Sequence, residues 1–206
     1  MSEDTKRMQL TAGAPEAGPD LRLVPAQHDI LVHTTADRRL AVKQWLLAGL
    51  DGFKYDQARM EWEEYQVTLM PLGVRFCAVR LPERLVHRVV RTNSPRMSAE
   101  YLAAALDDGP VIHDPRQRRY YALAPASMPE RWQNAASYWE TLGVSFLGRG
   151  SVVGIPRVDC VTLNPQTWAT YWAVPMPSAG VLCDPMTIAR LIAAAHRSPV
   201  RPETEA

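Results

Sequence analysis

The first apolar residues that recur at helical spacing lie within residues 37–50. They fall on one side of a helical wheel over residues 37–50, with Thr35 or Asp37 as the expected N-cap. A polar stretch with aromatic insertions follows at 55–65 and predicts a second helix, with its aromatic side packed inward. The pattern therefore predicts a helical N-terminal part over residues 37–65.

From residue 66 onward, short β-prone runs are separated by turn residues. The runs 66–70 and 74–81 flank Pro71-Leu72-Gly73, which predicts that these two strands form a tight hairpin. The runs 110–113 and 118–124 predict a second hairpin with its turn at 114–117. Three more strands are expected, over residues 144–147, 151–156 and 170–174.

Helical patterns alternate irregularly with these strands. Pro82 precedes an amphipathic helix over 83–91, Ser98 is the expected cap of a helix over 99–106, and Asp184 caps a final helix. Because no regular strand-helix-strand alternation is present, we expect an α+β fold with a mixed or antiparallel sheet and flanking helices.

The two ends of the 206-residue chain lack this apolar periodicity. Residues 1–20 and 198–206 are rich in polar, proline and small residues, which predicts disordered tails. The stretch 21–197 then forms a single α+β domain, with the helical part at 37–65 and the core at 66–197.

Charge and composition mainly exclude kinds of site and segment. Lysine and arginine number 23 against 22 acidic residues, so the net charge is +1, and no long apolar run predicts a membrane segment. Cys77, Cys160 and Cys183 have no spacing typical of zinc ligands or a disulfide framework, and buried free thiols in the cytoplasm are expected. No motif predicts catalytic residues, a metal site or a cofactor.

One local charge pattern does predict a function. Between residues 75 and 120, nine arginines stand against five acidic residues, and the basic residues of the 83–91 helix recur on one side of it. Arginines beside Tyr120 and Tyr121 would suit nucleic-acid binding through charge and base stacking, although a solvated helix face with core tyrosines explains the same pattern. The candidate binding residues are Arg80, Arg84, His87, Arg88, Arg91, Arg116, Arg118, Arg119 and Tyr120.

Two segments carry a family resemblance. Residues 70–82 read MPLGVRFCAVRLP and residues 109–125 read GPVIHDPRQRRYYALAP. These segments resemble the strand-turn-strand and the second hairpin of actinobacterial proteins with a bifunctional DNA primase/polymerase N-terminal domain. The strand at 151–156 and the segments 171–175 and 182–185 resemble the closing elements of that family. The resemblance covers about residues 66–195 and implies an RRM-like sheet.

This chain departs from the family at its metal site. Cys77 and Arg80 stand where the family carries aspartates, and Tyr120 stands near the position of its usual histidine. A two-metal site needs clustered carboxylates, and an arginine repels Mg²⁺. The resemblance therefore implies an inactive homologue that holds nucleic acid or a nucleotide, as an accessory in replication or mobile-element maintenance.

Two other functions remain open. A protein–protein interaction or regulatory module, including a homodimer, would expose Trp132, Trp139, Trp168 or Trp172 in one patch. An enzyme of unrelated chemistry would assemble a site from residues such as His87, His113, Asp114 and Glu140, although no spacing supports it.

Overall fold

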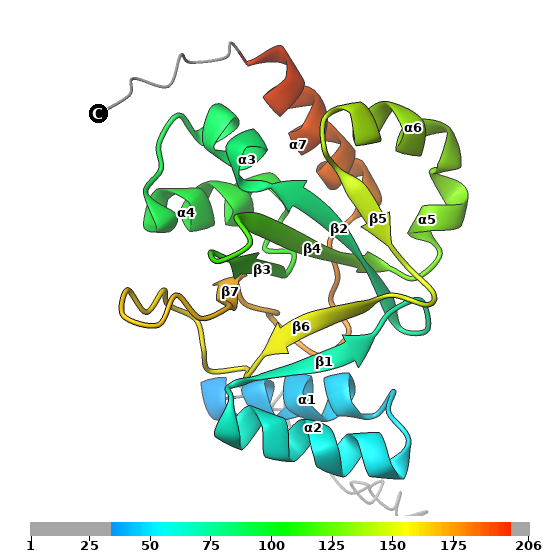
Figure 1. Ribbon diagram of the computed structural model, residues 1–206, viewed down its shortest axis with the longest axis vertical. Helices are drawn as coiled ribbons and strands as arrows, with labels where there is room; N and C mark the ends of the chain where they lie inside the picture. Colours follow the sequence, from blue (N-terminus) through cyan, green and yellow to red (C-terminus); the bar gives the residue numbers. More distant parts are fainter. Residues whose placement is uncertain (1–33, 199–206) are drawn as a thin grey trace, which may run out of the picture. The chain divides into compact units, whose positions relative to one another are not determined.

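A computed structural model describes residues 34–198. These residues form an α+β structure with antiparallel sheets, as expected (Figure 1). The predicted disordered tails, 1–20 and 198–206, lie outside the described residues except for Ser198. No helix within residues 34–198 is long and apolar enough to cross a membrane. In chain order the elements are α1 (Thr35–Leu47), α2 (Gly52–Glu64), β1 (Val67–Pro71), β2 (Phe76–Pro82), α3 (Glu83–Val90), α4 (Pro95–Ala105), β3 (Val111–Asp114), β4 (Arg119–Pro125), α5 (Met128–Arg131), α6 (Gln133–Thr141), β5 (Ser145–Leu147), β6 (Val152–Pro156), β7 (Tyr171–Val174) and α7 (Pro185–Arg197).

The strands form two antiparallel sheets. The larger sheet has the order β5-β2-β4-β3-β7, and β1 pairs with β6 in a separate two-stranded ribbon. The hairpin expected at 110–124 is confirmed, because β3 and β4 are adjacent and antiparallel.

The hairpin expected between 66–70 and 74–81 is wrong. The chain does turn sharply at Gly73, whose amide donates to the carbonyl of Phe76. The amide of Leu72, however, donates to Ser151 beside β6, and β2 leaves the ribbon to pair with β4 and β5. The turn therefore joins two sheets rather than two strands of one sheet.

The helix starts follow side-chain capping. Thr34 and Asp37 form a reciprocal capping box at α1. The expected cap at Ser98 is wrong, since Ser94 caps α4 with Pro95 in its first turn, and Ser98 is buried inside the helix. Residues 126–143, which showed no clear pattern, contain α5 and α6.

The larger sheet separates two hydrophobic clusters. On β2, Cys77, Val79 and Leu81 face the cluster that includes α3, α4 and α7. Phe76 and Ala78 face the cluster that includes α1, α2 and the ribbon. This alternation follows from strand geometry, so each residue of β2 is assigned to one side of the sheet. We call the first side the α3 face and the second the α1 face.

Candidate functional site

One row of residues crosses the larger sheet on the α1 face. Arg80 is paired with both Ser145 and Tyr121, Tyr121 with Ile112, and Ile112 with Trp172. Residues paired directly across strands project to the same side, and Ile112 and Trp172 belong to the cluster that includes α1. The row therefore runs Ser145, Arg80, Tyr121, Ile112, Trp172 along the α1 face, with Arg80 and Tyr121 half-buried.

A second cation lies next to this row. Arg119 is two residues before Tyr121 on β4, so it projects to the same side. It is paired with Pro82 on one flank and with Asp114 on the other. Within residues 34–198, neither Arg80 nor Arg119 forms an ion pair. Two guanidinium groups and a tyrosine ring therefore share one side of the sheet, with Asp114 directly across from Arg119.

The predicted stripe on α3 lies on the other side of the sheet. Leu85 and Val86 of this helix belong to the α3-face cluster, and α3 packs against α7 and α4. The four basic residues of the stripe, two of them exposed and two half-buried, are Arg84, His87, Arg88 and Arg91. The structure therefore does not gather the predicted arginines at one place.

The two turn arginines are bound to other parts of the chain. Arg116 donates through Nε and Nη2 to the carbonyl of Thr167, at 3.2 and 2.6 Å. Arg118 donates through Nε to Glu83, at 3.1 Å. Their positive charges remain, but these bonds hold both side chains beside the β3–β4 turn.

The prediction that Tyr120 stacks on a base is wrong. Its side chain is 0% exposed and its ring stacks on His113, with 4.0 Å between ring centroids. Because β4 alternates, Tyr121 projects to the opposite side and is the ring on the α1 face. The two tyrosines are indistinguishable in the sequence until the buried side of the strand is known.

A buried network of side-chain hydrogen bonds surrounds His113. Its ring lies 3.1 Å from Glu83 through Nε2 and 3.1 Å from the Tyr171 hydroxyl through Nδ1. Because the Glu83 carboxylate can only accept, Nε2 donates to it, and Nδ1 accepts from Tyr171. Burial lowers the pKa of His113, an effect that Glu83 opposes. His113 is 3% exposed, so a substrate cannot reach it, and this chain of bonds serves the fold.

The proposed enzyme residues do not converge. His87 lies near enough to His113 to affect its pKa, but Glu140 is on α6, and the Asp114 carboxylate accepts from the amide of Gln117 in the turn. In the part of the chain that the structure describes, no group of three histidine, cysteine or acidic residues could hold a metal ion. Cys77 and Arg80, the residues that the resemblance aligned with metal-binding aspartates, point to opposite faces of β2.

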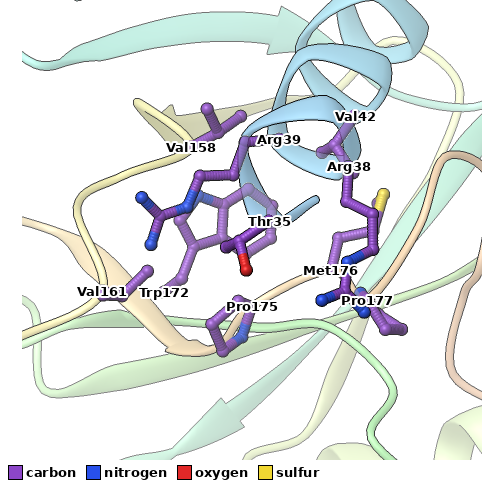
Figure 2. A pocket seen from close by; sticks show the side chains of 10 residues that line it. All are labelled: Thr35, Arg38, Arg39, Val42, Val158, Val161, Trp172, Pro175, Met176 and Pro177. Carbon is purple, nitrogen blue, oxygen red and sulfur yellow. The ribbon is translucent and has the colours of Figure 1, made fainter. Parts of the chain in front are cut away.

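A pocket opens near the end of the row, where Trp172 forms part of its wall (Figure 2). Its volume is about 270 Å³. Side chains from the first turns of α1, from residues after β6 and from the end of β7 line it. The lining residues are Thr35, Arg38, Arg39, Val42, Val158, Val161, Trp172, Pro175, Met176 and Pro177.

The sequence analysis missed this pocket. Arg38 and Arg39 are adjacent in the first turns of α1, which is the one local signal for it. Apart from the α1 residues, the lining comes from β7 and from the segments after β6 and β7, which are far from α1 in the sequence.

The chain matches no protein-family model, no curated protein and no solved structure.

Proposed function

We propose that this chain binds single-stranded nucleic acid at the half-buried part of the α1 face that carries Arg80, Tyr121 and Arg119, and that it carries out no polymerase chemistry. The observation that carries the proposal is the direct pairing of Arg80 with Tyr121, next to Arg119. Proteins hold single strands by stacking bases on aromatic rings and by placing cations along the phosphates. Tyr121 provides the ring, and Arg80 and Arg119 provide the cations.

The proposed absence of polymerase chemistry is argued from residue types. Polymerases of the resembled family need clustered carboxylates for two metal ions. Here the corresponding residues are a buried thiol, Cys77, and a guanidinium, Arg80, on opposite faces of one strand. Our proposal includes the role that the family resemblance implies: an inactive primase/polymerase homologue that serves as an accessory in replication or mobile-element maintenance.

Fluorescence anisotropy with a labelled single-stranded oligonucleotide tests the proposal. Two phosphate contacts predict a salt slope of about −1.4, so affinity should fall about sevenfold between about 50 and 200 mM salt. The Arg80→Gln/Arg119→Gln variant should bind more weakly and show a flatter salt dependence. The matched control, Arg84→Gln/Arg88→Gln, removes the same charge from α3 and should bind single strands like the wild-type chain.

Two results would overturn this assignment. Equal losses in both variants would mean that binding follows net charge rather than the α1 face. No binding at low salt would remove the nucleic-acid function itself.

A second candidate function, self-association, is favoured by one observation. Leu69 and Val152 lie on the same side of the β1–β6 ribbon and are 66% and 56% exposed. Exposed apolar residues gathered on one surface are typical of interfaces. The tryptophans do not supply the expected patch, since Trp139 and Trp172 are buried and Trp168 is 52% exposed. Sedimentation of the wild-type chain and a Leu69→Ser/Val152→Ser variant distinguishes a dimer from a monomer.

A further inference from the structure

We propose that the pocket beside α1 binds a small aromatic dianion, that is, a flat apolar ring system that carries two negative charges. This inference concerns a different set of cations from the nucleic-acid proposal and stands whether or not that proposal holds. The two share only Trp172, which ends the row on the sheet and forms part of the pocket wall.

The walls of the pocket favour an apolar ring. Trp172, Met176, Val158 and Val161 contribute aromatic and aliphatic surface. The indole nitrogen of Trp172 donates to the carbonyl of Pro156, at 3.1 Å, which satisfies its polar atom and fixes the ring. A preformed pocket with mostly apolar walls and a few polar groups is typical of small-molecule sites.

The charged groups favour a dianion. Figure 2 shows the guanidinium groups of Arg38 and Arg39 on either side of Trp172 and Thr35. Both arginines are exposed, and neither forms an ion pair within residues 34–198. Guanidinium groups bind carboxylate and phosphate through paired hydrogen bonds.

The nearby acids are already bound. The carboxylate of Asp159, whose pKa is lowered mainly by Arg157 and partly by Arg39, accepts from Arg157 Nε at 2.7 Å. The carboxylate of Asp37 accepts from the amide and hydroxyl of Thr34 in the capping box. The Asp159 carboxylate is therefore paired with Arg157 rather than with Arg39.

The volume sets the size of the ligand. Pockets for drug-sized molecules span about 300–1,000 Å³, so about 270 Å³ suits one or two fused rings with their anionic groups. A dinucleotide or a long acyl chain exceeds it. The charge can lie at one end, as in a phosphate monoester, or at both ends, as in a dicarboxylate.

Isothermal titration calorimetry of the full chain tests the inference with three probes. 1-Naphthyl phosphate carries its charge at one end, naphthalene-2,6-dicarboxylate carries one charge at each end, and 2-naphthol is neutral. We expect at least one dianion to bind with a dissociation constant below about 1 mM. 2-Naphthol should bind at least about tenfold more weakly, because it leaves both arginines unpaired.

Matched double variants identify the cations. Arg38→Ala/Arg39→Ala should weaken dianion binding by about tenfold or more, whereas Arg84→Ala/Arg88→Ala on α3 should not change it. All four side chains lie on helix surfaces, so circular dichroism should show both variants folded.

Three outcomes would overturn the inference: no dianion binds, 2-naphthol binds as tightly, or the Arg38→Ala/Arg39→Ala variant binds like wild type. Oligonucleotide binding without dianion binding would leave the nucleic-acid proposal intact and remove this one. Dianion binding without oligonucleotide binding would support this inference and remove the nucleic-acid proposal.

Discussion

Arg80 on β2 and Tyr121 on β4 are paired directly across the sheet and project to the same side of it. Their sequence neighbours Val79 and Tyr120 project to the other side and are fully buried. The cation and the ring are therefore brought together by strand pairing alone, although they lie far apart in the sequence. A single nucleotide could contact both, with its base on the ring and its phosphate on the guanidinium.

Replacing the tyrosine tests its stacking role. Tyr121→Leu keeps an apolar, half-buried side chain but removes the flat ring. Stacking of one base on an aromatic side chain contributes about 1–3 kcal/mol. We therefore expect affinity for a single-stranded oligonucleotide to fall by about 5- to 150-fold, measured by anisotropy. Tyr120→Phe, one residue away and buried, should leave the affinity unchanged, and an equal loss there would contradict the assignment.

The buried network of side-chain hydrogen bonds at His113 contributes to the stability of the fold. Glu83 accepts hydrogen bonds from His113 and Arg118, and its side chain is 14% exposed. Glu83→Gln removes the charge from both bonds and should lower the free energy of unfolding by about 1–3 kcal/mol. Glu100→Gln is the matched control, because its ion pair with Arg96 is exposed to solvent and should contribute little to stability. Urea unfolding of both variants measures the difference, and equal losses would show that the Glu83 bonds add nothing.

Stability should fall in mild acid. Burial lowers the pKa of His113 and of His87 below the ordinary value of 6.5. Between that value and the lower folded-state values, the unfolded chain binds more protons than the folded chain, so protonation favours unfolding. The contribution of these two histidines to the free energy of unfolding should therefore be constant above about pH 7.5 and decrease as the pH falls below about 6.5.

Urea unfolding as a function of pH measures this effect. The variant His113→Gln, although less stable at neutral pH, should lose less stability on acidification than the wild-type chain. An identical pH dependence in both proteins would show that His113 does not titrate in this range.

The turn between the ribbon and the larger sheet needs its glycine. Gly73 has a φ of +88°, and a Cβ there would lie 2.5 Å from the Cα of Arg149. Gly73→Ala combines a left-handed backbone with a backbone clash and should cost about 2 kcal/mol or more. Gly52→Ala, at the open start of α2 with no atom within 4 Å, should be neutral or slightly stabilising. Thermal unfolding compares the two, and a neutral Gly73→Ala would indicate that the turn moves freely.

Local patterns predicted much of the secondary structure. The β3–β4 hairpin was predictable because a four-residue turn joins two strands that are adjacent in the chain. The last helix was predictable because Asp184 and Pro185 mark its start and its apolar residues recur at helical spacing. The start of α4 carried the same kind of signal, at Ser94 and Pro95, four residues before the position assigned to it.

The sequence by itself determined most of the segments that form strands and helices, where arginines concentrate, and that neither Cys77 nor Arg80 carries a carboxylate. Tertiary structure alone decided that β1 pairs with β6, that Tyr121 rather than Tyr120 shares a face with Arg80, and that α1 and β7 enclose a pocket. The reason is physical. Strand alternation guarantees that neighbouring residues point in opposite directions, but which direction is buried depends on helices packed from distant parts of the chain.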